Sequence, residues 1–229
     1  MKTRSSENWA CQAGSQNLLN TNKIYESKLI YGMPEILDLP QKEPLNLDFV
    51  PCQHYKKGEN KGVLFFTEDH FNNAIWNRPE HYCDKFSKAH TVFSPDFSPY
   101  NDYPEALQIF NIYRSRYITR VFQEYGLNVI PYINHNDVNT FEYSFAGTPK
   151  GKMIAISTLG QAFILEIFQE LLKQVQPSKI YCYGKKDSSK YLNEFENIVF
   201  LETFMQGRTR IIKKKKMLSS FKSIKFDIK

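Results

Sequence analysis

The pattern of hydrophobic and polar positions changes near residue 61, and this change divides the chain. Before it, Asn, Pro and charged residues concentrate at residues 17–22 and 40–51, which is typical of turns and extended segments. After it, short apolar runs alternate with segments of helical periodicity. We therefore expect an extended N-terminal arm over residues 1–60, packed on a core domain over residues 61–203.

Six short apolar runs in the core predict β-strands. They are GVLFFTED from residue 62, HTVFSPD from 90, LNVIPYINH from 127, GKMIAISTLG from 151, SKIYCYG from 178 and NIVFLETF from 197. Their apolar residues are nearly continuous rather than alternating, which is typical of strands that are buried on both faces of a parallel sheet.

Helical patterns lie between these runs. The strongest spans residues 104–125, where Pro104 falls in the first turn and apolar residues recur at three- and four-residue spacing: Phe110, Tyr113, Tyr117, Val121 and Tyr125. A second covers residues 162–175, and shorter ones cover 70–76 and 190–196. The alternation predicts an α/β fold with a mainly parallel sheet of about six strands. Two architectures fit: an open doubly wound sheet, or an incomplete β/α barrel.

Charge changes the picture at the C-terminus. The chain has a net charge of +6, but residues 204–229 contain nine Lys or Arg and one Asp, which leaves −2 for the rest. The cations that cluster in this basic tail are Arg208, Arg210, Lys213, Lys214, Lys215 and Lys216. One interpretation is a solvated terminus; the other is an arm that binds the phosphates of DNA or RNA.

Other whole-chain features limit the location of the protein. No run of about 18 apolar residues is present, so we expect no membrane span. The N-terminus has no apolar segment of the signal-peptide kind, which predicts a cytoplasmic protein. The oligomeric state leaves no signal in the sequence.

Polar residues gather just after the predicted strands, where sites of parallel sheets form. An enzyme acting on nucleic acid or a nucleotide would use these positions, with Mg²⁺ or Mn²⁺ as cofactor. The carboxylates that would hold the metal are Glu68, Asp69 and Asp96. The residues that would act in catalysis are Asp69, Asp96, His135 and Arg116.

Each of these residues also has a structural interpretation. Asp96 would bond backbone amides in a turn, and Asp69 would cap the helix over residues 70–76. His135 would be a hydrogen-bonded structural residue, and Arg116 would pair with a nearby acid. The sequence contains no Walker loop, G-x-G-x-x-G, H-E-x-x-H or G-x-S-x-G motif to decide between the two sets.

The central block resembles a known family. The segments FFTEDHFNNAIWNRP, VFSPDFSPYNDYPEALQIFNIYRSRYI, GLNVIPYIN and FAGTPKGKMIAISTLG are similar to the domain of unknown function 4417, which occurs in bacteria, phages and other mobile elements. The resemblance covers roughly residues 62–185 and implies no reaction. It directs attention to Asp69, Trp76, Asp96, Ser98, Tyr100, Arg114 and Arg116.

Two functions therefore stay open. The first is a phage- or mobile-element-type protein that acts on nucleic acid, as a metal-dependent hydrolase, nuclease or nucleotide enzyme with its site at the strand ends. The alternative is a non-enzymatic protein that binds nucleic acid or a partner and in which the loop SPDFS, residues 94–98, is structural.

Overall fold

The computed structural model describes residues 19–21, 23–135, 140–159, 165–184, 192, 195–203 and 205–206. The predicted cations of the basic tail, Arg208, Arg210, and Lys213 to Lys216, lie outside these residues, as does most of the helix predicted at 190–196. Within the described part of the chain, no helix is both long and apolar enough to cross a membrane.

The fold is α/β, as the alternation of runs predicts, and all strand pairs are parallel. Each of the six predicted runs contains a strand: β2 (Gly62–Leu64), β3 (Thr91–Phe93), β4 (Val129–Ile130), β5 (Met153–Ser157), β6 (Lys179–Tyr183) and β7 (Ile198–Leu201). A further strand, β1 (Phe49–Pro51), comes from the predicted N-terminal arm and pairs with β2.

The strands form two sheets, of order β1-β2-β3-β4 and β5-β6-β7. A single parallel bridge between Tyr132 and Ala155 joins them. There the Ile133 amide donates to Ala155 O at 2.9 Å, and the Ala155 amide donates to Pro131 O at 2.8 Å. The strands thus follow one another in chain order without the reversal of a doubly wound sheet. This order is that of a β/α barrel, but β1 and β7 are edge strands and the barrel is not closed.

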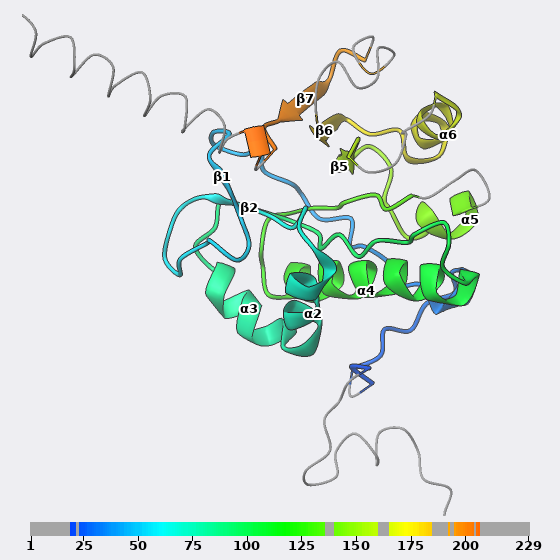
Figure 1. The fold of residues 1–229 in the computed structure, drawn as a ribbon, viewed down its shortest axis with the longest axis horizontal. Helices are drawn as coiled ribbons and strands as arrows, with labels where there is room; N and C mark the ends of the chain where they lie inside the picture. Colours follow the sequence, from blue (N-terminus) through cyan, green and yellow to red (C-terminus); the bar gives the residue numbers. More distant parts are fainter. Residues whose placement is uncertain are drawn as a thin grey trace, which may run out of the picture.

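The helices cover the outside of this open barrel. They are α2 (Asp69–Asn77), α3 (Pro79–Phe86), α4 (Glu105–Glu124), α5 (Phe141–Ser144) and α6 (Leu165–Val175), with a 3-10 turn η1 (Ile30–Gly32) before them. Helices α2, α3 and α4 lie on the same side of the first sheet, and α6 lies beside the second (Figure 1).

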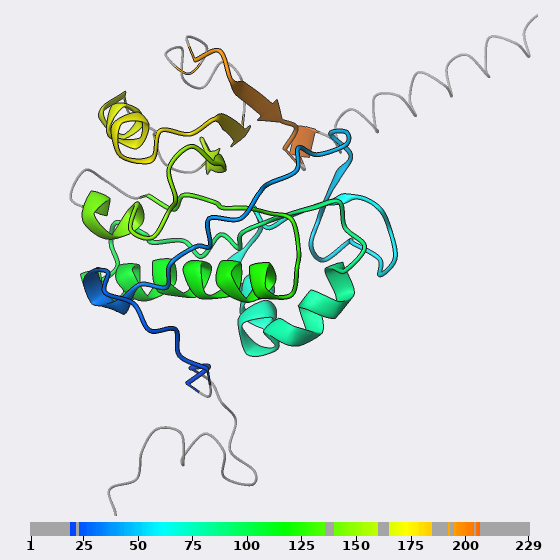
Figure 2. The ribbon, with the colours of Figure 1, turned by 180° about the vertical axis from the view of Figure 1, so that it is seen from behind.

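Helix α4 is buried more widely than one apolar stripe predicts. Tyr117 and Val121 are buried as expected, but Tyr125 is 53% exposed, and the buried set includes polar Ser115 and Thr119. The cause is that α4 has several neighbours. The sheet covers one side, α2 and α3 pack beside it, and the N-terminal segment runs along it (Figure 2).

The sheet curls so that side chains of distant strands meet inside it. On β6, Ile180 and Cys182 pack with α6, whereas Tyr181 and Tyr183 join the other core cluster. Tyr183 stacks on Phe66, which follows β2, with ring centroids 4.4 Å apart and planes at 9°. Because β2 and β6 are four positions apart in the strand order, this contact requires a curved sheet. Aromatic rings therefore fill the interior of the open barrel.

The N-terminal segment closes the gap that the single bridge leaves between β4 and β5. The Gln41 amide nitrogen donates to Val129 O and Met153 O, both at 3.0 Å. The Gln41 amide oxygen accepts from the Met153 amide at 2.7 Å. One side chain thus replaces the backbone pairing that β4 and β5 lack at this end.

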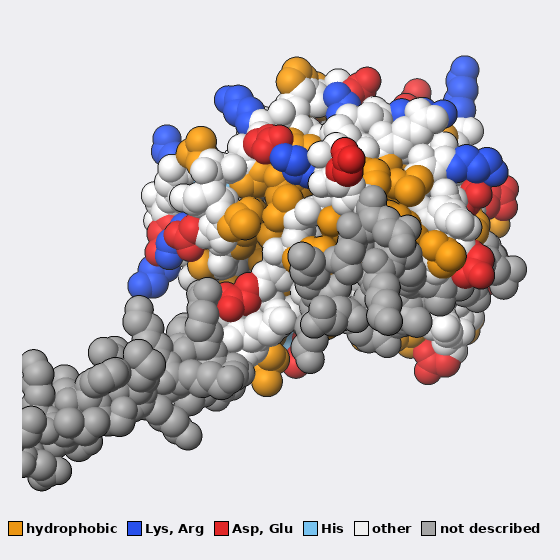
Figure 3. All heavy atoms as spheres, turned by 90° about the horizontal axis from the view of Figure 1, so that it is seen from above, with side chains coloured by type: hydrophobic (Ala, Val, Ile, Leu, Met, Phe, Trp, Pro, Cys, Tyr) orange, Lys and Arg blue, Asp and Glu red, His pale blue; other side chains and the backbone are white. Residues whose placement is uncertain are grey.

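The outer surface carries mixed charge. On the face seen from above, hydrophobic side chains gather between side chains of both signs (Figure 3). The part of this face that the structure describes has no patch of a single sign, in keeping with the nearly neutral charge calculated for the chain without its tail.

Candidate active site

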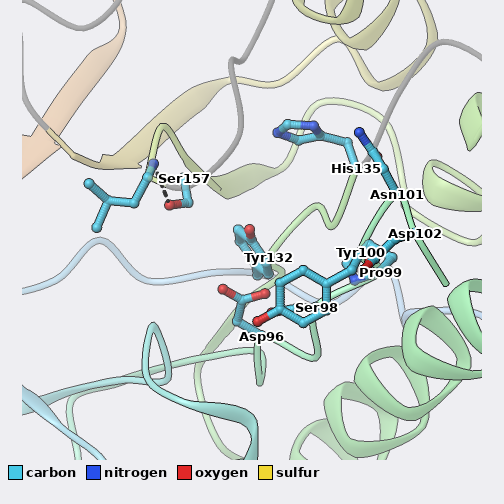
Figure 4. A pocket seen from close by; sticks show the side chains of 10 residues that line it. Asp96, Ser98, Pro99, Tyr100, Asn101, Asp102, Tyr132, His135 and Ser157 are labelled. Atoms are coloured by element: carbon cyan, nitrogen blue, oxygen red, sulfur yellow. Dashed lines mark hydrogen bonds between the residues drawn. The ribbon is translucent and has the colours of Figure 1, made fainter.

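A pocket of about 480 Å³ opens at the carboxyl ends of β3, β4 and β5. We name it the mouth pocket. Its lining residues are Asp96, Ser98, Pro99, Tyr100, Asn101, Asp102, Tyr132, His135, Ser157 and Leu159. Asp96 and Tyr132 lie on one side of the opening, and His135 and Ser157 lie on the other (Figure 4). The structure therefore brings the predicted residues Asp96 and His135 to one cavity, at the end of the barrel where such folds place their sites.

The segment after β3, residues 94–98, is held by side chains from three directions. Four successive carbonyls each accept a side-chain hydrogen bond, from Ser115 to Pro95 at 2.8 Å, Asn72 to Asp96 at 2.6 Å, Asn134 to Phe97 at 2.9 Å and Asn111 to Ser98 at 2.7 Å. The Ser94 amide still donates to Ile130 O at 3.1 Å, but residues 95–98 belong to no strand of the described structure. The side chains therefore satisfy the carbonyls that a sheet would otherwise satisfy. They also explain why so many polar residues surround SPDFS.

Asp69 belongs to this support. It is the first residue of α2, and Glu68 occupies the cap position that the structural interpretation gave to Asp69. The Asp69 carboxylate instead accepts from the Ser98 amide at 3.3 and 3.4 Å and from the Ser98 hydroxyl at 3.4 Å. Burial raises its pKa, while the Ser98 bonds and the Arg114 guanidinium oppose that rise. Asp69 thus fixes the end of the segment that carries Asp96.

Arg114 reinforces the same segment from α4. Its guanidinium lies over the Phe97 ring, 4.0 Å from the centroid. It also donates to Asn111 Oδ1 at 2.6 Å and to Asn73 Oδ1 at 2.7 Å. Arg114 thus contacts the segment directly at Phe97 and supports it indirectly through Asn111, which holds the Ser98 carbonyl. It is not part of the lining of the mouth pocket.

Asp96 is the partly buried acid of the mouth pocket, whereas Asp102, the other acid in its lining, is exposed. The Asp96 side chain accepts from Asn134 Nδ2 at 3.2 Å and is hydrogen-bonded to Tyr132. Burial, helped by the nearby Asp69 carboxylate, raises the pKa of Asp96 to about 8. This rise favours the protonated carboxyl, which is a hydrogen-bond donor as well as an acceptor.

The two titratable side chains beside Asp96, His135 and Tyr132, also have shifted pKa values that favour their uncharged forms. Burial lowers the pKa of His135 to about 4, against a hydrogen bond to the Ser157 backbone. Burial and Asp96 raise the pKa of Tyr132 well above its ordinary value. No Lys or Arg is present among the residues that line the described pocket. The deep part of the pocket is therefore polar but without positive charge.

Glu68 does not join Asp69 and Asp96. Its side chain is 81% exposed and lies 3.2 Å from His70. Among the residues that the structure describes, no group of three or more His, Cys, Asp and Glu is arranged to hold a metal ion. The Mg²⁺ or Mn²⁺ site stays a prediction; of its three predicted carboxylates, Glu68 is exposed beside His70, Asp69 accepts from Ser98, and Asp96 lines the mouth pocket.

Arg116 lies apart from the mouth pocket. It is only 1% exposed, and its Nη2 donates to the Ser144 carbonyl at the end of α5. Burial lowers its pKa to about 10. The paired-acid interpretation finds no acid among its described contacts, and the lining of the mouth pocket does not include it. The sequence places Arg116 on a helix but does not show that its side chain contacts the Ser144 carbonyl.

Sequence reasoning missed several residues of the site. Tyr132 comes directly after β4 in an apolar run, so the pattern assigns it to the core, whereas Ser157 is one of the polar residues at the predicted strand ends. Asn72 and Asn111 sit on helices, where an Asn is usually exposed, yet they are 0% and 5% exposed. The sequence signal for such a residue is an Asn on the apolar face of a predicted helix, which indicates a buried side chain that needs hydrogen-bond partners.

Comparison with known proteins places this architecture in a family. The family described as a domain of unknown function (DUF4417) matches residues 25–202. The chain is a member of the DUF4417 family. The match begins before β1 and ends after β7, so the DUF4417 region includes every strand and the mouth pocket.

Two phage proteins are similar to this DUF4417 chain along most of their length. The Gene 1 protein of Mycobacterium phage L5 is 30% identical over 200 residues, which cover 80% of this chain and 84% of the phage protein. The Gene 1 protein of Mycobacterium phage D29 is 30% identical over 193 residues, covering 80% and 71%. No solved structure matches the chain.

Proposed function

We propose that this DUF4417 protein binds nucleotides or nucleic acid, with an uncharged part of the nucleotide in the mouth pocket and Asp96 as the proton donor. The observation that carries the proposal is the Asp96 carboxyl, hydrogen-bonded to Tyr132 and exposed to a pocket at the carboxyl ends of parallel strands. A volume of about 480 Å³ lies in the usual range of small-molecule pockets.

The protonation of Asp96 suits this role in two ways. A neutral carboxyl donates a hydrogen bond to a carbonyl oxygen or a ring nitrogen, which are the acceptors of a nucleobase edge. A pKa of about 8 also lies near the working pH, where an acid transfers its proton most effectively. The same group thus supports recognition and general acid catalysis.

The charge of the pocket argues for the base rather than the phosphate inside it. A phosphate needs cations or several convergent amides, and the described lining contains no Lys or Arg. The phosphates would remain outside the pocket, and the basic tail of residues 204–229 would add sequence-independent attraction for them.

A metal-dependent reaction is the extension of this proposal. In it Asp69 and Asp96 hold Mg²⁺ or Mn²⁺, which prefer oxygen ligands. The metal would require ionised Asp96 and would therefore compete with its proton. Metal affinity should rise with pH up to about 8, the pKa of Asp96.

The test is a binding titration with nucleoside monophosphates and a single-stranded oligonucleotide, on the full chain and on Asp96→Ala and Asp96→Asn. We expect Asp96→Ala to weaken binding at least about tenfold, because it removes the side-chain donor. Asp96→Asn, whose amide nitrogen still donates, should bind more tightly than Asp96→Ala. Truncation after Gln206 should weaken oligonucleotide binding and flatten its salt dependence, without affecting the mononucleotides. Wild-type protein that binds none of these ligands would overturn the proposal.

One observation favours a second function, a non-catalytic binding protein. Every carbonyl from Pro95 to Ser98 is held by a side-chain donor, as expected of a loop whose task is structural. In that case an Asp96→Ala variant that folds normally keeps full function in its host. Loss of host function without loss of stability would favour the first proposal.

A further inference from the structure

The rim of the mouth pocket differs chemically from its floor. The floor contains the polar side chains of Asp96, Tyr132 and His135, whereas two of the rim residues are large and apolar. Tyr100 is 46% exposed and Leu159 is 47% exposed. A pocket with a polar floor and an apolar rim fits a ligand that has hydrogen-bonding atoms at one edge and flat apolar faces.

Tyr100 and Leu159 approach the pocket from two sides. Tyr100 follows β3 and Leu159 follows β5, while β4 and its continuation through Tyr132 lie between these strands. Figure 4 shows the Tyr100 ring reaching over the pocket toward Asp96. A flat ring stacked on Tyr100 would therefore have its edge near Asp96.

Both rim residues are held in position by bonds that leave their side chains accessible. The Tyr100 carbonyl accepts from the Tyr103 amide at 3.0 Å, and the two rings pack edge to face with centroids 5.2 Å apart. The Leu159 amide donates to Ser157 Oγ at 3.1 Å. These contacts fix the backbone on each side of the opening, so little conformational entropy is lost there when a ligand binds.

We propose that the mouth pocket takes a nucleobase stacked on Tyr100, with the edge of the base directed at the polar floor that contains Asp96. This rests on the proposed nucleotide binding and adds the residue on which the base stacks. Aromatic stacking is tolerant of base identity because every base has a π-face.

The test compares ligands and variants by calorimetric titration of the full-length protein. The probes are AMP, GMP, CMP, UMP and dTMP, with ribose 5-phosphate as the ligand that lacks a base. We expect Tyr100→Ala to weaken nucleotide binding about tenfold, whereas Tyr100→Phe, which keeps the ring, stays within about twofold. Leu159→Ala should weaken binding by a smaller factor. Tyr125→Ala is the matched control, because Tyr125 is 53% exposed and is not part of the pocket lining.

The outcomes separate this inference from the proposal beneath it. If the wild-type protein binds no nucleotide, the proposed function fails and the inference with it. If nucleotides bind but ribose 5-phosphate binds equally well, nucleotide binding stands and recognition of the base in the mouth pocket is wrong. Nucleotide binding that is the same in Tyr100→Ala as in Tyr125→Ala would also overturn the inference. Selective loss in Tyr100→Ala, recovered in Tyr100→Phe, would support it.

Discussion

Replacing Asp96 by Asn should change how the stability of the protein depends on pH. The pKa of Asp96 is about 8 in the folded chain, above the value of about 4 expected when unfolded. The folded chain therefore binds this proton more tightly. The group lowers stability progressively as the pH rises from the unfolded pKa to the folded one. Asn has nearly the same shape and carries no charge at any pH, so the variant lacks this loss.

The magnitude follows from the window between the two pKa values. Each pH unit within it is worth about 1.4 kcal/mol, or about 2.7 kcal/mol between about pH 5 and pH 7. Asp96 is only partly buried and faces an open pocket, where water screens part of the effect. We therefore expect the stability of Asp96→Asn relative to wild type to rise by about 1–2 kcal/mol over that range. Altered bonds to Asn134 and Tyr132 add an offset that does not depend on pH.

Urea unfolding from about pH 5 to pH 9 measures this difference, and the slope against urea checks that both proteins unfold in the same way. The matched control is Asp84→Asn, because the Asp84 side chain is 65% exposed. Its difference from wild type should stay nearly constant with pH. A constant difference for Asp96→Asn as well would mean that Asp96 is ionised throughout, and it would refute the proton-donor role.

Three further predictions test the scaffold and the metal. Asn72→Ala should lower the free energy of unfolding by about 2–3 kcal/mol, because it leaves the carbonyls of Phe65 and Asp96 without their side-chain donor. Replacing the exposed Asn77 by Ala should lower it by less than about 0.5 kcal/mol in the same urea assay. Gln41→Ala should destabilise the protein by about 1–3 kcal/mol, because it removes the side chain that bridges β4 and β5. The control is Gln174→Ala at an exposed position, and equal effects of the two substitutions would contradict the bridging role of Gln41. If the metal extension is correct, millimolar Mn²⁺ should raise the melting temperature of wild type more at about pH 8 than at pH 6 and leave Asp96→Asn unchanged, and an unshifted wild type would remove the metal.

The order of the elements could be predicted from the sequence because each strand is a short, continuous apolar run. Strand β1 was missed because Phe49–Pro51 has only three residues and stands in a Pro-rich segment. Helix α3 was missed because it follows α2 with only Arg78 between them, so the two read as one polar stretch. Short elements that depend on tertiary pairing leave little periodic signal.

Some residues of the site could also be predicted from the sequence, and others could not. Asp96 and His135 could be placed because parallel strands bring their carboxyl ends to one edge. The roles of Asp69 and Arg116 could not be predicted. The sequence does not show whether a charged side chain faces a ligand or a backbone group. Only the positions of Ser98 and Ser144 decide which groups these two side chains meet.

The Gln41 junction has a consequence for how the chain folds as it is synthesised. Strands that pair in chain order can be added one after another as they leave the ribosome, because each needs only the strand before it. Gln41 is an exception, since its partner Met153 lies 112 residues later. The segment around Gln41 emerges early and waits for β5 before it can dock. The docking of the Gln41 segment across this junction is therefore a long-range event, and translation, rather than local pairing, sets the earliest moment at which it can occur.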